Sequence, residues 1–235
     1  MILTAHQPVY LPWLGLFHKI AVADLFCYFD IVQYQKKDFN NRNKIKTSAD
    51  EMWLSVPVES KDHLSKNVST IKIVQDGWVK KHLRAIELNY RKAPYFDQYF
   101  DPFADVMRAS SNDDLGTLNL ALLRFFIEHL GIDTPIVKAS DYAFTGTKSD
   151  LIQNMCETLG AQTYVFGAQG RDYANRDSFQ KSGINLYFQK YVHPEYAQIN
   201  GPFKPYMSVI DLLLNVGPGS LGVIMGGNIG ASALK

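Results

Sequence analysis

Short apolar runs separated by helix-like spacing organise this chain. Runs that predict buried strands occur at residues 1–6 (MILTAH), 26–34 (FCYFDIVQY), 136–139, 163–167 (TYVFG) and 185–188 (NLYF). Two further runs, 52–58 and 69–74, predict strands that are antiparallel. After the first run, apolar residues from Trp13 to Leu25 recur near a 3.6-residue period, which predicts a helix. Residues 1–34 therefore have the size of one βαβ unit.

The middle of the chain is dominated by helical periodicity. Residues 78–91, 94–108 and 115–130 are expected to be helices, and Gly131 follows the third as a terminating glycine. Helices are also expected at 147–159 and 207–215. Two α/β regions thus flank a helical stretch, with no linker or internal repeat between them.

This order predicts an α/β fold: a Rossmann-like, mainly parallel sheet with a helical insertion in the middle of the chain, roughly residues 78–131. We expect a single domain over residues 1–220, followed by a Gly-rich tail, 221–235, and that the chain from 217 onward frays or folds over the surface. Right-handed crossovers place the loops after residues 1–6 and 136–139 at one edge of the sheet, where α/β proteins bind ligands.

Composition narrows the functional classes. Apolar residues make up 46% of the 235 and the net charge is +1, which excludes a disordered chain and argues against a general polyanion binder. The N-terminus lacks the pattern of a signal peptide, and no apolar run approaches a membrane span, so we expect a cytoplasmic protein. Cys27 and Cys156 are expected to be buried thiols, and no Cys/His spacing predicts a zinc site.

The first candidate cluster lies between the first strand and the first helix, at residues 6–15 (HQPVYLPWLG). It follows the carboxyl end of a strand, and His6 has the chemistry of a general acid or base near neutral pH. Gln7, Tyr10 and Trp13 add polar and aromatic groups for binding. Alternatively, His6 is a hydrogen-bonded core histidine and Trp13 is part of the packing.

The second cluster covers residues 30–46. Its candidate binding side chains follow Asp30 at the end of an apolar strand, and they are Gln33, Asn41, Arg42, Asn43 and Lys44. Arginine and lysine hold phosphate or carboxylate groups, and the asparagines make a dense hydrogen-bonding surface. Alternatively, the segment is a solvated hairpin with Asn in its turns.

Two later segments add candidates. Residues 167–173 (GAQGRDY) follow a predicted strand and contain Gly170, Arg171 and Tyr173, although the motif is neither a Walker A loop nor GxGxxG. Residues 192–211 contain His193, Ser208 and Asp211. Polar residues at helix starts are commonly caps, and this remains the alternative for each of them.

The chain resembles the WbqC-like family through an ordered set of these positions. The N-terminal part consists of His6 to Gly15, Phe17, Lys19, Ile20, Ala23-Asp24, Asp30, Val32-Gln33, Asn41-Arg42-Asn43 and Ile45. The later part consists of Gly170 to Tyr173, His193 to Tyr196, Phe203, Ser208, Asp211 to Leu213, Asn215, Gly217 and Pro218. The resemblance covers roughly residues 2–220.

The resemblance implies a role in bacterial surface-polysaccharide (O-antigen) biosynthesis. The association of the family with glycylated amino sugars implies N-acyl or N-aminoacyl (glycyl) transfer onto a nucleotide-linked amino sugar. A fainter similarity links the first βα unit to adenylyl- and nucleotidylyltransferases. In those enzymes an HxGH-type motif binds phosphates where this chain has residues 13–16 (WLGL).

For a transferase, His6 or Asp30 is the expected base, and the other candidates bind a nucleotide-linked amino sugar and an activated acyl or aminoacyl donor. The sequence leaves the cofactor unknown. The alternative is a non-catalytic protein that binds nucleotide sugars or assembles a complex in the same pathway. Nucleic-acid binding through the basic residues 36–46 is the least favoured class, because the basic run is short.

Overall fold

The computed structural model describes residues 1–59, 61 and 66–235. Its centre is a five-stranded sheet in the order β5-β2-β1-β6-β7, in which all neighbouring strands are parallel. The expected α/β class and Rossmann-like sheet are therefore confirmed. The strands span Ile2–His6 (β1), Leu25–Tyr28 (β2), Ile136–Lys138 (β5), Thr163–Phe166 (β6) and Asn185–Phe188 (β7).

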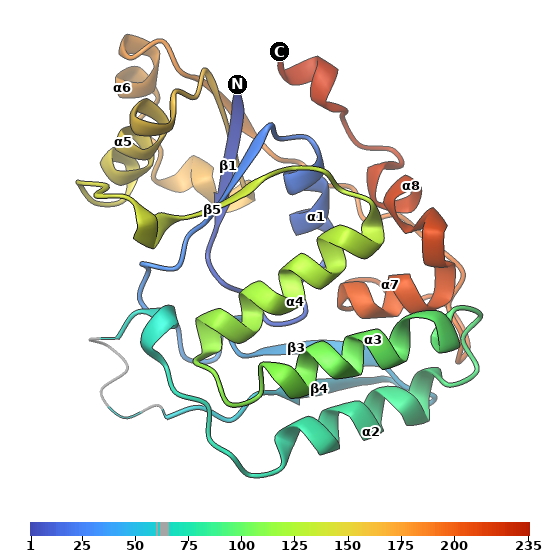
Figure 1. Ribbon diagram of the computed structural model, residues 1–235. Coiled ribbons are helices and arrows are strands. Elements are labelled where there is room, and N and C mark those ends of the chain that lie inside the picture. Colours follow the sequence, from blue (N-terminus) through green and yellow to red (C-terminus); the bar gives the residue numbers. More distant parts are fainter. Residues whose placement is uncertain (60, 62–65) are drawn as a thin grey trace.

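Helices cover both faces of this sheet (Figure 1). One face packs against α5 (Ser149–Leu159) and α6 (Arg176–Lys181). The other packs against α1 (Leu14–Ala21) and is continuous with the main core. Burial on both faces explains why the strands are short, nearly continuous apolar runs.

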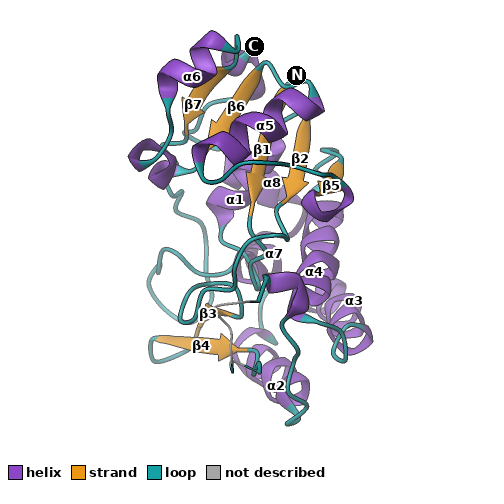
Figure 2. Ribbon diagram, turned by 90° about the vertical axis from the view of Figure 1, so that its left-hand side faces the viewer, coloured by secondary structure: helices purple, strands orange, loops and turns teal. Residues whose placement is uncertain are grey.

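Between β2 and β5 the chain builds a second layer below the sheet (Figures 1 and 2). This layer begins with an antiparallel hairpin, β3 (Arg42–Lys46) and β4 (Glu51–Ser55). Three helices follow, α2 (Trp78–Tyr90), α3 (Phe96–Ala109) and α4 (Leu115–Leu130), and the later helix α7 (Val209–Val216) packs against α3 and β3.

Helix α4 shows how the sequence sets the ends of an element. The Asp114 carboxylate accepts a hydrogen bond from the Thr117 amide at 2.8 Å, which caps the first turn. Gly131 ends the helix with a φ of 69°, a left-handed conformation that favours glycine. Both the extent of this helix and its terminating glycine were predicted.

Two expected strands differ in the structure. The run 26–34 ends as a strand at Tyr28, because Asp30 turns aside to accept hydrogen bonds from Ser140. Residues 69–74 form a 3₁₀ turn, η2 (Val68–Thr70), followed by isolated bridges. The alternating residues at 69–74 therefore make isolated bridges, Lys72 with Asp114 and Ile73 with Val58, rather than a continuous strand.

The basic stretch before residue 46 contains the unexpected strand β3. Its side chains alternate, with Asn43 and Ile45 buried while Arg42 and Lys44 remain partly exposed. This alternation of buried and exposed positions is typical of a half-buried strand. It is not visible as an apolar pattern in the sequence, because polar residues such as Asn43 occupy buried positions.

The C-terminal tail folds over the surface. It forms α8 (Ser220–Met225), flanked by the 3₁₀ turns η5 (Gly217–Gly219) and η6 (Ala231–Leu234). Ile224 and Leu234 are buried, and α8 contacts α1. Cys27 and Cys156 are both buried free thiols, as expected.

A buried carboxylate holds the second layer together. Asp211, in the first turn of α7, accepts hydrogen bonds from the hydroxyls of Tyr90 at 2.7 Å and Tyr196 at 2.6 Å. The Gln198 amide donates a third at 2.7 Å. Burial raises the pKa of Asp211, and the three hydrogen bonds oppose that shift.

We predict that Asp211→Ala lowers the free energy of unfolding by about 3 kcal/mol, because three buried donors lose their acceptor. Asp101→Ala, which removes an exposed carboxylate from α3, is the control and should change it by less than about 0.5 kcal/mol. Chemical denaturation at pH 7 measures both. Equal stability of the two variants would contradict a structural role for this carboxylate.

Candidate functional site

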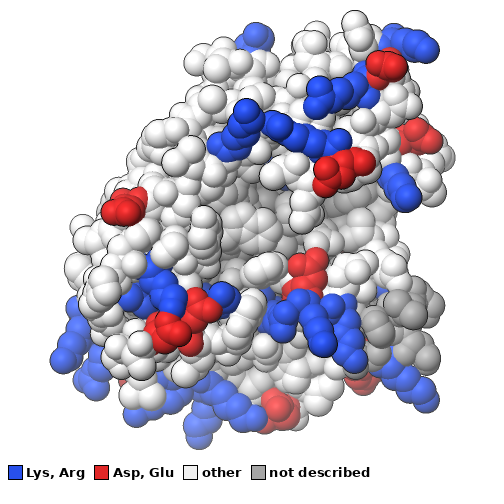
Figure 3. Space-filling model, turned by 180° about the vertical axis from the view of Figure 1, so that it is seen from behind, with Lys and Arg blue, Asp and Glu red and all other residues white. Residues whose placement is uncertain are grey.

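The carboxyl ends of the sheet strands point toward the β3–β4 hairpin (Figure 2). In the space-filling view from behind, the surface is hollowed near its centre, with Lys and Arg side chains above and below the hollow (Figure 3). Ligands of open α/β sheets bind outside the carboxyl ends of the strands. We therefore take this edge of the sheet, with the facing hairpin, as the candidate site.

Residues 6–13 cross this edge as a buried loop. Two of its carbonyl groups accept hydrogen bonds from asparagine side chains: Asn40 donates to the Pro8 carbonyl at 2.7 Å and Asn43 to the Leu11 carbonyl at 2.6 Å. Leu11 has a φ of 45°, a left-handed conformation that is rare for leucine. The hairpin and the sheet edge are thus fixed relative to one another.

His6 ends β1 at the centre of the edge. Its Nδ1–H donates to the Gln7 carbonyl at 2.8 Å, which leaves Nε2 with a free lone pair and no hydrogen-bond partner in the described part of the chain. Burial, together with the charge of Lys19, lowers the pKa of His6 to about 3. The imidazole is therefore neutral at physiological pH.

Lys19 lies behind His6 on α1. Its ammonium donates to the Ala5 carbonyl at 2.8 Å and is 3% exposed. It forms no ion pair with a carboxylate among the residues that the structure describes. Burial lowers the pKa of Lys19 from 10.5 to about 7, so stability decreases as the pH falls from about 10.5 to about 7, and the full cost of burying the charge is present below that range.

Asp30 is also at the carboxyl edge, but its carboxylate is occupied. The backbone amide of Ser140 donates to Oδ1 at 2.9 Å and the Ser140 hydroxyl donates to Oδ2 at 2.7 Å. Asp30 is 5% exposed. Its contacts tie β2 to the turn after β5, and His6 is the better placed of the two expected bases.

A row of aromatic rings leads from His6 to the hairpin. The His6 ring lies 5.4 Å from Trp13, Trp13 lies 5.6 Å from Phe39, and Phe39 lies 5.9 Å from Trp53 between centroids. We call these four residues the aromatic row. Trp13 was a predicted binding residue, whereas Phe39 and Trp53 were not.

Arg42 and Lys44 lie at the hairpin end of the row. The Arg42 guanidinium carbon is 4.6 Å from the Trp53 ring centroid, and the Lys44 ammonium is 5.1 Å from it. Lys44 also pairs with Glu51, whereas Arg42 donates to the Lys37 carbonyl. The structure thus brings Arg42, Lys44 and His6 to one site.

The loop after β6 supplies the opposite side. Gly170 packs so closely on Phe166 that a Cβ would lie 2.4 Å from its ring, so only glycine fits. This packing places η4 (Ala168–Asp172) at the carboxyl edge. Arg171 is exposed and lies 5.6 Å from the Phe188 ring, and Tyr173 is 46% exposed.

Several other predicted residues have structural contacts. Tyr10 is fully buried and its hydroxyl hydrogen-bonds with His82 Nδ1 at 2.8 Å. Asn43 donates to the loop and Asp211 accepts the tyrosine hydrogen bonds described above. Ser208, which is also buried, precedes α7 and pairs with Trp13 in a β-bridge. A role of these side chains in binding a substrate stays a prediction. The contacts seen in the structure are with other residues of the protein.

The remaining predicted residues lie around the hairpin and its neighbours. Gln7 donates to Asp38 at 3.2 Å, and Asn41 donates to the Val56 carbonyl at 2.8 Å. Gln33 is exposed and pairs in a bridge with Asn67. His193 is half-buried, and its Nδ1 donates to the Pro194 carbonyl at 3.0 Å.

The chain is similar to a known protein family over most of its length. The WbqC-like protein family matches residues 7–222. The chain belongs to the WbqC-like protein family. It is also 35% identical over 212 residues to the uncharacterized protein Rv1507c of Mycobacterium tuberculosis (strain ATCC 25618 / H37Rv), covering 90% of this chain and 92% of that protein. No solved structure matches significantly.

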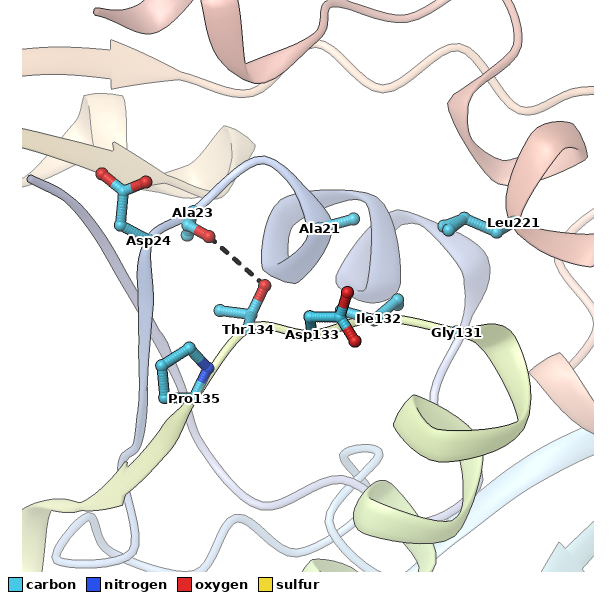
Figure 4. Close-up of a pocket in the computed structure, with 9 residues that line it drawn as sticks. All are labelled: Ala21, Ala23, Asp24, Gly131, Ile132, Asp133, Thr134, Pro135 and Leu221. Atoms are coloured by element: carbon cyan, nitrogen blue, oxygen red, sulfur yellow. Dashed lines mark hydrogen bonds between the residues drawn. The ribbon is translucent and has the colours of Figure 1, made fainter.

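Two depressions lie away from the carboxyl edge. One, of about 370 Å³, lies where α1 meets the segment after α4 and is lined by residues such as Asp24, Asp133 and Thr134 (Figure 4). The other, of about 790 Å³, lies between α2 and α3. Neither contains a predicted site residue.

Neither a membrane-spanning helix nor a metal-binding cluster occurs among the residues that the structure describes. None of their helices has the length and apolar character needed to cross a bilayer. They also contain no group of three or more His, Cys, Asp or Glu side chains arranged to hold a metal ion.

Sequence reasoning missed Phe39, Trp53 and Lys19 as members of the site. Phe39 and Trp53 are unusual because large aromatic side chains stay 37% and 42% exposed. Lys19 interrupts the apolar pattern of α1, and a lysine at an inward position is the signal that would have identified it.

We predict that Lys19→Met raises the pKa of His6, because the variant removes the neighbouring positive charge that disfavours the imidazolium. Burial remains, so the value should stay below the ordinary 6.5. Titration of the imidazole resonances by NMR measures the change. His82, whose pKa is lowered to about 4 mainly by burial, is the internal control. An unchanged His6 pKa would contradict the coupling.

Proposed function

We propose that this protein is an enzyme of surface-polysaccharide biosynthesis that transfers an acyl or aminoacyl group, such as glycyl, onto a nucleotide-linked amino sugar. The observation that carries the proposal is a neutral His6 with a free Nε2, at the carboxyl edge of a parallel sheet and beside aromatic and cationic side chains. Family membership supports the same pathway. A cytoplasmic location belongs to the proposal.

In the proposed step, the amine of the sugar attacks the carbonyl carbon of the activated donor. His6 Nε2 accepts a proton from the attacking nitrogen as the new N–C bond forms. The tetrahedral intermediate then expels the leaving group of the donor with the electron pair of the broken bond. Cationic groups at the edge stabilise the negative oxygen and bind the phosphates of the nucleotide.

The substrate class follows from the surroundings of His6. Aromatic rings pack against the apolar faces of sugars and bases, and the row provides such faces next to the proposed base. Arg42 lies against Trp53 on the hairpin, and Arg171 extends from the loop after β6. Guanidinium groups bind phosphate oxygens in two-point contacts.

A second candidate function is non-catalytic binding of a nucleotide sugar in the same pathway. The observation that favours it is the low pKa of His6, about 3, which makes the imidazole a weak proton acceptor in the unliganded protein. Binding without chemistry would use the same aromatic and cationic groups.

We predict that His6→Gln lowers kcat by about 10²- to 10⁴-fold and changes KM little, because the glutamine removes the proton acceptor and keeps a polar side chain. The assay incubates the protein with UDP- or dTDP-linked amino sugars and acyl or aminoacyl donors, and mass spectrometry detects the acylated sugar. His129→Gln, on α4, is the control variant.

Unchanged turnover by His6→Gln would remove His6 as the base. Saturable binding of the nucleotide sugar by the wild-type protein, with no product from any donor, would instead favour the non-catalytic function.

A further inference from the structure

We propose that the outer face of the β3–β4 hairpin is a nucleobase subsite, in which Trp53 and Phe39 stack on the base while Arg42 binds the adjoining phosphates. This inference rests on the proposed function, because it assigns one end of the nucleotide-linked substrate. It concerns two residues, Phe39 and Trp53, that were not among the predicted binding residues of the transferase.

The exposure of the two rings is the first argument. Trp53 is 42% exposed and Phe39 is 37% exposed, although each could bury a large apolar surface. They contact each other with centroids 5.9 Å apart. A pair of touching aromatic rings that is left open to solvent gains free energy when a planar ligand covers it.

The hairpin register places these groups on one face. Trp53 lies directly opposite Lys44 in the antiparallel pair, and Arg42 is two residues from Lys44 on the same strand. Side chains two apart on a strand point to the same side. The other side of the hairpin, with Asn43, Ile45 and Leu54, faces the core.

The charges fit a nucleotide better than a neutral ligand. Arg42 forms no ion pair with a carboxylate in the described part of the chain. Its Nε is buried without a hydrogen-bond partner among the described residues, and one terminal nitrogen donates to the Lys37 carbonyl. The guanidinium is therefore held against Trp53, and an anion next to a stacked base would neutralise it.

The position of the subsite agrees with the chemistry at His6. Trp13 and Phe39 lie between His6 and Trp53, with successive centroid distances of 5.4, 5.6 and 5.9 Å. A nucleoside diphosphate sugar has its base at one end and its sugar at the other. With the base on Trp53, the phosphates and sugar extend along the row toward His6.

Exposed aromatic and basic side chains also occur where proteins bind membrane surfaces. The hollow seen in Figure 3 and the continuity of the row with the partly buried His6 favour a small ligand. Vesicle binding is therefore treated as an outcome of the test.

The experiment measures binding of UDP, dTDP and inorganic pyrophosphate to the full-length protein by calorimetry. Trp53→Ala should weaken UDP or dTDP binding about 5- to 150-fold, the range expected for loss of base stacking, and leave pyrophosphate binding unchanged. Trp53→Phe should retain most of the affinity. Arg42→Gln should weaken both nucleotide and pyrophosphate binding.

Met52→Ala is the matched control. Met52 neighbours Trp53 on the same strand and is 41% exposed, but it points to the opposite side of the hairpin. It should bind UDP as the wild type does. Circular dichroism of all variants checks that each is folded.

Wild-type affinity for UDP and dTDP in Trp53→Ala would overturn the subsite, and so would the absence of saturable binding by the wild-type protein. Trp53-dependent sedimentation with anionic vesicles, without nucleotide binding, would assign the face to a membrane and also overturn it. Trp53-dependent UDP binding without any transfer product would support the subsite and count against the transferase. Product formation by Trp53→Ala with an unchanged KM would support the transferase and contradict the subsite.

Discussion

The structure depends on how the buried loop between β1 and α1 satisfies its backbone. When a chain leaves a central strand and stays buried, its carbonyl groups no longer have the regular hydrogen-bond partners of a strand or helix. Other groups must then donate to them. Asn40 and Asn43 provide them for Pro8 and Leu11. The same hydrogen bonds join the hairpin layer to the sheet. The need to satisfy the buried carbonyl groups therefore also sets the geometry of the candidate site.

This constraint explains why polar residues of the chain have two kinds of role. The sequence places Asn41, Asn43 and Asp211 in segments rich in hydrogen-bonding groups, and such segments predict binding sites. In the structure, Asn43 is 1% exposed and Asp211 is fully buried, and both complete networks within the fold. A polar group that satisfies buried backbone and one that awaits a ligand look alike in a sequence.

Local signals were sufficient for part of the fold. The apolar run of β1, the stripe along α4 and the glycine at its end specify their elements without help from distant residues. The parallel sheet also follows, because strands alternate with helices in two regions. The expected strand at 69–74 was wrong because its alternation serves bridges at an edge, and no local signal separates these cases.

Part of the candidate site was predictable because it follows the ends of sheet strands. His6 and the loop with Gly170 and Arg171 follow sheet strands, so topology brings them to one edge. Trp53 could not be assigned, because its exposure depends on which side of the hairpin faces the core. That side is decided by packing of Ile45 and Leu54.

The electrostatics of this edge bear on the proposed substrate class. Asp30, the carboxylate nearest the end of β2, is occupied by Ser140, while neither Lys19 nor Arg42 has a carboxylate partner in the described part of the chain. A buried cation without an anionic partner, such as the Lys19 ammonium, is costly until an anion approaches, because its desolvation is not repaid. A neutral sugar would leave that cost in place, whereas the phosphates of a nucleotide sugar would relieve it. This electrostatic argument supports the proposal of a nucleotide-linked sugar over a free one, and it does not depend on any chemistry at His6.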